Sequence, residues 1–160
     1  MKGSGINKAK TPEEALQYID AAVPFIELPD LAFAKEVKIN GPAITAVNVA
    51  ARLGVVGDPI PVKANKEWLE RLKNFKLQIY DDKGQMLIEG QGSALLEHPL
   101  NVVLWIRDSL KAEGKLLKEG DLLSLGTITK LTPTTPGTTI RARYVGLDPQ
   151  GPVEITVKFK

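Results

Sequence analysis

One carboxylate and one imidazole are the side chains of this sequence that could most readily do chemistry. Glu27 lies in the apolar run PFIELPDL. A carboxylate among apolar neighbours must be paired, protonated or bound to a metal. An ion pair with a lysine stays open as the alternative. His98, the single histidine, precedes Pro99 at the start of a helical pattern, where its ring can pack or hydrogen-bond free backbone amides. No Ser-Asp pair or metal cluster stands near it in the sequence, so His98 indicates a structural role.

The other polar candidates give weaker signals. Asp81 and Asp82 are adjacent carboxylates, but they fall in a hairpin turn, which favours a solvated turn. Gly92 and Ser93 follow a strand-like run, and glycine there permits a close backbone approach. The favoured interpretation of this stretch is a tight bend into the next segment. The threonine-rich run 126–139 supplies hydroxyls, but Thr is common in strands for packing reasons. No catalytic residue can be assigned from these patterns alone.

Periodicity and turn signals predict the elements that position these residues. A capping box at Thr11 and helical spacing predict a helix that ends near Val23, before Pro24. The run KLQIYDDKGQMLIEG alternates around a turn in which Gly84 can take positive φ, which predicts a hairpin. A second helix should begin at Pro99 and stop at Gly114. We also expect one or two helical turns in 65–75 and strands at 24–31, 44–48, 55–62, 118–127 and within 137–160.

Composition and length limit the class of protein. With 160 residues and 43% hydrophobic residues, the chain can form one domain with a sizeable core; we assign 1–10 to a flexible lead and 11–160 to that domain. The net charge of +2 is scattered, which argues against nucleic-acid binding. Cysteine is absent, which excludes disulfide scaffolds and thiolate sites. No apolar run reaches the roughly 18 residues of a membrane span, and the N-terminus lacks an apolar signal core, so a cytoplasmic protein is expected.

Strands outnumber helices and do not alternate regularly with them. We therefore predict the α+β class, with a mostly antiparallel or mixed sheet and a few flanking helices. Taken alone, the residues indicate only such a domain with a possible carboxylate-centred site.

Five motifs in order add a family resemblance. They are PFIELPDL, AVNVAARLGVVGDP, GQGSALLEHPLNVVLWI, LKEGDLLSLGT and PGTTIRARYVGLDPQG. In sequence and spacing they resemble the C-terminal part of 2-oxopent-4-enoate hydratases, which belong to the fumarylacetoacetate hydrolase superfamily together with 2-oxo-hexenedioate decarboxylases. The resemblance covers the chain from about Ile6 onward, and its most specific element is the block with Gly92, Ser93 and His98.

The resemblance implies a rolled, mixed sheet of the superfamily's C-terminal-domain type and a metal-dependent lyase, either a hydratase or a decarboxylase. Its substrates would be 2-hydroxy-dienoate or 2-oxo-enoate acids from the breakdown of aromatic compounds. Its cofactor would be Mg²⁺ or Mn²⁺, because a hard cation prefers oxygen ligands and stabilises an enolate. The site residues implied are Glu27 for the metal and, for the substrate, Asn48, Gly92, Ser93, Gly126 and Thr127.

Departures from the family pattern qualify this implication. The family's other metal carboxylates form a Glu-x-Glu or Glu-x-Asp pair upstream of the helix that begins here at Pro12, and this sequence has no residues there. The lysine and the acid/base groups of the family's N-terminal region are missing as well. Leu125 stands where hydratases usually carry Thr. We therefore expect a domain truncated at its N-terminus, with an incomplete metal site.

Two hypotheses follow for the function. The first is a lyase whose missing ligands come from a homo-oligomer or a complementing chain. The alternative is a non-catalytic family member that acts as an assembly or binding module. The sequence leaves open the choice between hydration and decarboxylation and the side chain of the substrate.

Overall fold

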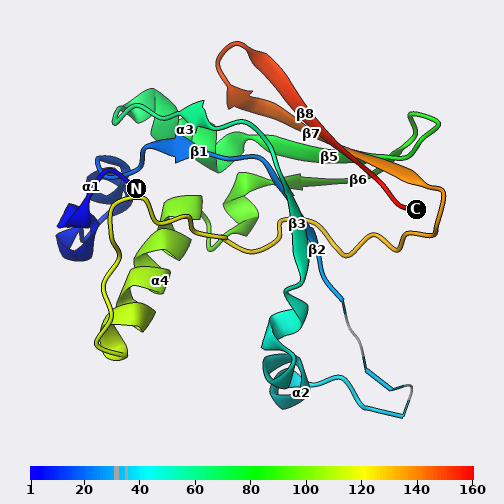
Figure 1. The fold of residues 1–160 in the computed structure, drawn as a ribbon. Helices are drawn as coiled ribbons and strands as arrows, with labels where there is room; N and C mark the ends of the chain where they lie inside the picture. The colour runs from blue at the N-terminus through cyan, green and yellow to red at the C-terminus, as the bar shows by residue number, and fades with distance from the viewer. Residues whose placement is uncertain (31–32, 35) are drawn as a thin grey trace.

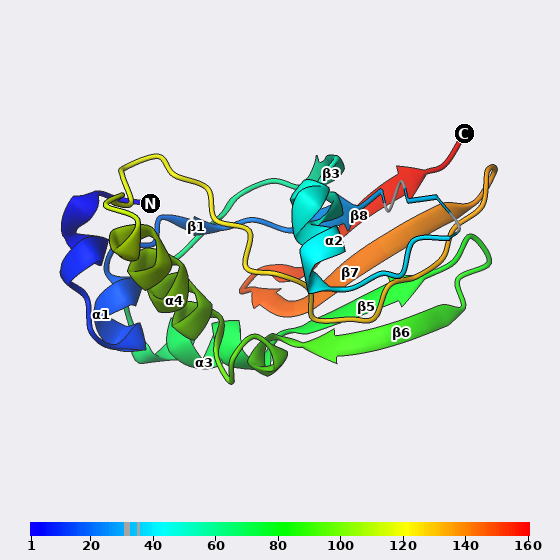
Figure 2. The same ribbon diagram turned by 90° about the horizontal axis from the view of Figure 1, so that it is seen from below.

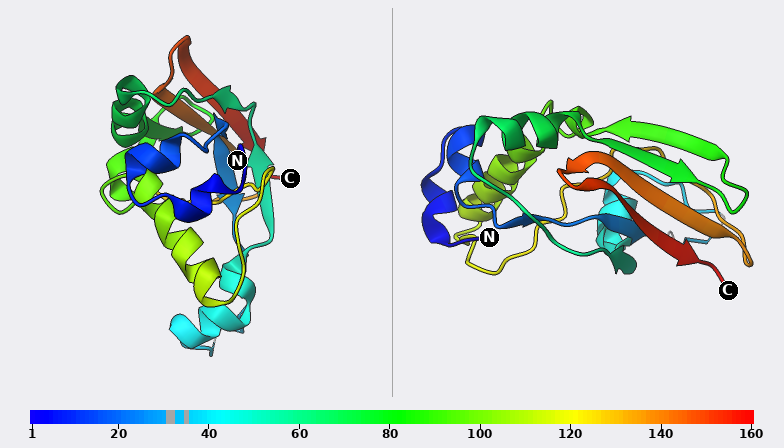
Figure 3. Two further views of the ribbon diagram at one scale, coloured as in Figure 1. Left: turned by 90° about the vertical axis from the view of Figure 1, so that its left-hand side faces the viewer. Right: turned by 90° about the horizontal axis from the view of Figure 1, so that it is seen from above.

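The computed structural model describes residues 1–30, 33–34 and 36–160. A four-stranded sheet forms one end of the molecule, and helices α1, α3 and α4 gather at the other, as Figures 1 and 2 show. Two short ribbons of paired strands, β1 with β4 and β2 with β3, run between these ends. The views in Figure 3 show the same separation of helices and sheet.

The large sheet has the strand order β6-β5-β7-β8, and each neighbouring pair is antiparallel. Its inner face buries Leu77, Ile79, Ile140 and Tyr144, which alternate with polar residues on the outer face. The predicted hairpin is confirmed, and Gly84 takes a φ of 79° in its turn. The strands are β5 (Lys76–Tyr80), β6 (Met86–Gln91), β7 (Thr139–Asp148) and β8 (Gly151–Lys158).

Side-chain caps start the helices at the opposite end. The Thr11 hydroxyl accepts a hydrogen bond from the Glu14 amide at 3.2 Å, as the capping box predicted. Asn65 begins α3 in the same way and accepts from the Trp68 amide at 2.9 Å. The helices are α1 (Pro12–Leu16), α3 (Lys66–Asn74) and α4 (Pro99–Ala112). Their inward residues, including Leu16 and Trp68, join the same apolar core as the sheet.

The remaining elements are short. They are the ribbons β1 (Ala21–Ala22) with β4 (Ile60–Pro61) and β2 (Phe25–Leu28) with β3 (Leu53–Val56), the helix α2 (Gly41–Ala46), and the 3₁₀ turns η1 (Ser4–Lys8), η2 (Asn48–Ala50) and η3 (Gly92–Ala94). The segment 113–138 contains no helix or strand and returns the chain from α4 to the sheet. Among all the residues that the structure describes, no helix is long and apolar enough to cross a membrane.

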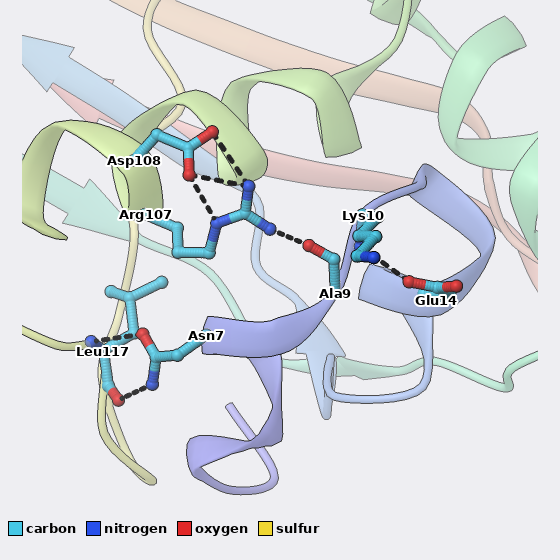
Figure 4. Close-up of polar contacts among 7 residues, drawn as sticks. All are labelled: Asn7, Ala9, Lys10, Glu14, Arg107, Asp108 and Leu117. Carbon is cyan, nitrogen blue, oxygen red and sulfur yellow. Dashed lines mark hydrogen bonds and ion pairs between the residues drawn. The ribbon is translucent and has the colours of Figure 1, made fainter.

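The N-terminal segment is attached to α4 and to the loop that follows it (Figure 4). The side-chain amide of Asn7 donates through Nδ2 to the Leu117 carbonyl at 2.8 Å and accepts through Oδ1 from the Leu117 backbone amide at 3.0 Å. Arg107 of α4 donates to the Ala9 carbonyl and pairs with Asp108. Ile6 is fully buried. Residues expected to be a flexible lead therefore contribute to the core.

Three of the predicted elements are wrong or incomplete. The first helix ends at Leu16 rather than near Val23, and residues 21–22 form β1. The expected strand 44–48 is instead α2 and η2, because the Asn40 side chain accepts from the Ala43 amide and caps a helix there. The expected strand 118–127 is irregular, since its leucines alternate toward the core without a strand partner.

Other predictions need smaller corrections. The expected strand 55–62 is two strands separated at residues 57–59, and the one or two turns expected in 65–75 form the nine-residue α3. The strand predicted at 24–31 is β2, although Leu31 lies outside the described residues. Of the two sheet types left open, the antiparallel one is found: the pairings among the described strands include no parallel pair. The α+β class is confirmed.

Candidate functional site

A groove of about 530 Å³ lies between the segment 19–27 and the loop 120–128. Its floor is apolar and comes from the helices and the sheet, through residues that include Leu72, Phe75, Leu100, Val103 and Tyr144. The groove therefore joins the two ends of the fold. An apolar concave surface with a few polar groups is the usual form of a small-molecule site.

Three of the six residues implied by the resemblance line this groove. Glu27 projects from β2, while Gly126 and Thr127 lie on the facing loop. Gly126 has a φ of 91°, a backbone conformation that favours glycine. The Thr127 hydroxyl donates to the Thr129 carbonyl at 3.1 Å, which holds the loop in its turn.

Glu27 lies on the exposed face of β2, opposite Gly54 of β3. The expectation that its apolar neighbours bury it is wrong, because alternation along the strand turns Glu27 away from Ile26 and Leu28, which are half-buried. No pairing or protonation is therefore forced on this carboxylate by burial. It remains open to a ligand in the groove.

Tyr144 fixes the start of β2 and was missed by the sequence analysis. Its hydroxyl accepts from the Phe25 amide at 3.0 Å and donates to the Phe25 carbonyl at 2.7 Å. Burial raises the pKa of Tyr144 above its ordinary value of 10, so the hydroxyl stays protonated. Tyr144 alternates with Ile140 and Ala142 on the inner face of β7. This alternation could have indicated its role, because a buried tyrosine hydroxyl usually needs a hydrogen-bond partner.

The other three predicted site residues do not line the groove. Asn48 is exposed and begins η2, where Asn48, Val49 and Ala50 all have positive φ, of 53°, 57° and 61°. Such a conformation is costly for a β-branched residue and is often found at functional sites. Gly92 is buried in η3 beside the half-buried Ser93.

The close approach predicted at the glycines is present and has a packing cause. A Cβ on Gly92 would lie 2.3 Å from the Leu72 carbonyl oxygen and 2.7 Å from the Phe75 ring. A Cβ on Gly90 would lie 2.2 Å from the Ile128 carbonyl oxygen, so only glycine lets the loop 120–128 cross β6 there. Gly90 thus places the loop that carries Gly126, whereas Gly92 lets η3 pack against α3 and Phe75.

His98 caps α4, as predicted. Its Nδ1 accepts from the Leu100 amide at 3.0 Å, and its Nε2 lies 3.1 Å from the Leu69 carbonyl oxygen. This arrangement requires the neutral ring with the proton on Nε2. Desolvation by burial is the main cause that lowers the pKa of His98 below its ordinary value of 6.5. The turn role predicted for Asp81 is also confirmed: its carboxylate accepts from the amides of Lys83 and Gln85.

The residues that the structure describes do not form a complete magnesium site. Three carboxylates, Glu27, Asp20 and Asp121, are among the described residues that line the groove, and the extended segment 20–27 separates Asp20 from Glu27. Across the described ranges no group of three or more His, Asp and Glu side chains is placed to hold a metal. Mg²⁺ keeps near-octahedral oxygen coordination, so Glu27 alone does not fit that ion.

Comparison with known proteins confirms the resemblance. No family model matches the chain. Over 134 residues it is 25% identical to a protein named 4-oxalocrotonate decarboxylase from Pseudomonas sp. (strain CF600), covering 84% of this chain and 48% of that protein. Over 138 residues it is 26% identical to a 2-keto-4-pentenoate hydratase from Paraburkholderia xenovorans (strain LB400), covering 86% and 49%. These are the two enzyme classes of the fumarylacetoacetate hydrolase superfamily that the motifs indicated.

A solved structure shares the fold. The 4-oxalocrotonate decarboxylase from Pseudomonas putida G7, complexed with magnesium and adipate, superimposes with a TM-score of 0.77 at 24% identity, over 93% of this chain and 52% of that one. The same enzyme complexed with calcium and acetate gives a TM-score of 0.75. The chain thus spans about half the length of the relatives that it matches.

Proposed function

We propose that this chain provides part of the active site of a metal-dependent lyase. The reaction is hydration or decarboxylation of a 2-hydroxy-dienoate or 2-oxo-enoate acid from the breakdown of aromatic compounds. We further propose that the fold is of the superfamily's C-terminal-domain type, with residues 11–160 as the hydratase-like catalytic domain. A cytoplasmic location and a homo-oligomeric state remain predictions from the sequence.

One observation carries the proposal. Glu27 and the Gly126–Thr127 turn line the same groove, whose floor is apolar. Residues 120–128 and β2 are far apart in the chain. The fold therefore brings together two motifs, one assigned by the resemblance to the metal and the other to the substrate. The names of the relatives, a decarboxylase and a hydratase, are consistent with this chemistry.

The described residues would contribute binding and orientation. Glu27 would supply one oxygen ligand to a divalent cation, Mg²⁺ or Mn²⁺, whose chemistry is to stabilise an enolate. The apolar floor, including Phe75 and Leu100, would hold the carbon chain of the substrate and exclude water from it. We assign Gly126 and Thr127 to the end of the substrate that carries its carboxylate.

The incomplete ligand set makes assembly part of the proposal. Because Glu27 does not fit Mg²⁺ by itself, we propose that further carboxylates come from another polypeptide, either a complementing chain or a second copy in a homo-oligomer. Asn48, Gly92 and Ser93 then remain substrate-binding candidates only if the completed site extends beyond this groove. The alternative of a non-catalytic module gains no support from the names of the relatives.

The direct test adds Mg²⁺ or Mn²⁺ to the purified chain and follows the loss of the ultraviolet chromophore of a 2-hydroxy-dienoate. Metal-dependent loss, with the chain alone or with a complementing chain, is the expected result. Glu27→Gln should reduce the rate about hundredfold or more, since even changes around metal ligands cost 10- to 100-fold. Glu119→Gln, an exposed residue outside the groove, is the matched control. Absence of turnover under every one of these conditions would refute the proposal.

A further inference from the structure

The end of the groove opposite Glu27 is acidic. Asp20 and Asp121 both line the groove. The Gly120 amide donates to the Met1 carbonyl and the Lys2 amide to the Tyr18 carbonyl, which brings 120–121 close to 18–20 and away from Glu27 on β2. Asp20 is exposed, and the half-buried Asp121 accepts a hydrogen bond from the Lys118 amide at 2.7 Å, which holds its carboxylate in place. Among the described residues that line the groove, no side chain is Lys, Arg or His. Even with the amino group of Met1 counted, two carboxylates leave this end with a net negative charge.

Between the two ends the groove is apolar. The apolar residues that line it include Leu72, Phe75, Leu100 and Val103, together with Leu122 and Leu123 of the loop 120–128. A bound carbon chain would lie against these residues. Its far end would then come close to Asp20 and Asp121. The chemistry of that far end decides whether the groove accepts the molecule.

We propose that the substrate is a monocarboxylic 2-oxo acid with a short apolar tail, and that dicarboxylic analogues are disfavoured. The inference rests on the proposed function, because it assumes that the 2-oxo acid group binds at the end with Glu27, where the cation of the completed metal site would neutralise the charges. A second carboxylate at the tail would meet two like charges without a basic partner, and it would lose its hydration. An apolar tail has neither cost and gains from contact with the floor.

The two relatives differ in this respect. 4-Oxalocrotonate carries two carboxylates, whereas 2-keto-4-pentenoate carries one. The groove therefore favours the substrate type in the name of the hydratase over that in the name of the decarboxylase. The charges of Asp20 and Asp121, rather than overall identity to either relative, support this choice.

Ligand-observed NMR with two matched probes tests the proposal on the purified chain, alone and with a complementing chain, at low salt with Mg²⁺ present. 2-Oxohexanoate and 2-oxohexanedioate share a carbon chain and differ only in a terminal methyl or carboxylate group. We expect 2-oxohexanoate to bind about tenfold more tightly, equivalent to about 1.4 kcal/mol. The difference should shrink as salt is added, because the charges are near the surface.

The double substitution Asp20→Asn with Asp121→Asn should raise the affinity for the dicarboxylate and leave that for the monocarboxylate unchanged. Asn at 121 can still accept the Lys118 hydrogen bond, and circular dichroism checks the fold. Asp58→Asn with Asp82→Asn changes the net charge equally outside the groove and should leave both affinities unchanged. Equal or tighter binding of the dicarboxylate, or no change in the ratio on substitution, would overturn the inference alone. If neither probe binds, with the chain alone or with a complementing chain, the groove is not the substrate site and the proposed function fails with the inference.

Discussion

The cap formed by His98 makes stability depend on pH in a defined window. The neutral ring accepts from the Leu100 amide through Nδ1, and Nε2 lies 3.1 Å from the Leu69 carbonyl oxygen, where its proton can be donated. Protonation of Nδ1 would remove the acceptor at the start of α4. The folded protein therefore resists protonation, which agrees with the lowered pKa of His98.

The direction of the effect follows from the two pKa values. His98 has a lower pKa in the folded state than its ordinary 6.5, so between those two values the unfolded chain binds more protons. The contribution of His98 is fully present above pH 6.5 and is lost as the pH falls through the folded-state pKa. The carboxylates with lowered pKa, such as Glu89, start from 4.5 and lose their contribution only at lower pH. A comparison of pH 7.5 with pH 5.5 thus isolates the histidine.

The magnitude can be estimated from the two hydrogen bonds. Loss of an N-cap costs about 1 kcal/mol, and loss of the second bond, to the Leu69 carbonyl, costs about 1 kcal/mol more. His98→Ala should therefore lower the free energy of unfolding by about 2 kcal/mol at pH 7.5. Urea unfolding followed by circular dichroism measures it.

His98→Asn is the matched control, because asparagine can cap the helix without titrating. It should cost less than His98→Ala, and the loss of stability between pH 7.5 and pH 5.5 should disappear in both variants. The reasoning is refuted if the wild type shows no such loss, or if the loss persists in either variant.

Three further substitutions test the packing around the groove. Gly92→Ala should lower the unfolding free energy by more than about 2 kcal/mol in urea, because its Cβ would overlap backbone at 2.3 Å; Gly41→Ala, where a Cβ meets open space, should not destabilise, and equal effects would contradict the packing argument. Asn7→Ala leaves the backbone of Leu117, a residue 2% exposed, without two partners, so thermal unfolding should show a loss of about 2 kcal/mol, whereas a change near zero would exclude that link. Tyr144→Phe should speed hydrogen exchange at the first amide of β2 by about tenfold, equivalent to about 1.4 kcal/mol, and unchanged exchange would show that β2 does not depend on the tyrosine.

Local signals in the sequence predicted the elements whose residues determine their own conformation. The hairpin with Gly84, the capping box at Thr11 and the helix after His98 each have a start, a period and an end within a short window. Such patterns need no information from distant residues. The cap made by His98 is local as well, because its Nδ1 accepts from the Leu100 amide on the same helix. Its contact with the Leu69 carbonyl, 29 residues away, depends on the packing of α3 against α4.

The errors arose where distant contacts decide the structure. The helix from Pro12 stops early because the chain must reach the strand pairing of Ala21 with Pro61. The apolar alternation of 118–127 would suit a strand, but that segment follows the groove without a pairing partner. Exposure of Glu27 likewise depends on its pairing with β3. No local pattern carries this information.

The residues of the candidate site also fall into two groups, those that packing explains and those that it does not. Glu27, Gly126 and Thr127 share a groove, a juxtaposition that only the motif order had indicated. Gly92 has a sufficient explanation in its contact with the Leu72 carbonyl, so its presence in a motif is no evidence of substrate binding. A glycine required by packing would be retained whether or not the protein is an enzyme. Glu27 differs, because its exposed position gives no structural reason for a carboxylate.

That difference identifies the residue on which the function should be judged. The residues that would meet the substrate tail, the apolar floor and the two aspartates, all belong to this chain. Turnover, in contrast, requires a cation that Glu27 does not fit by itself. Tail selectivity and catalysis should therefore separate: Asp20→Asn with Asp121→Asn should change the preference between 2-oxohexanoate and its dicarboxylate, whereas Glu27→Gln should lower turnover without changing that preference.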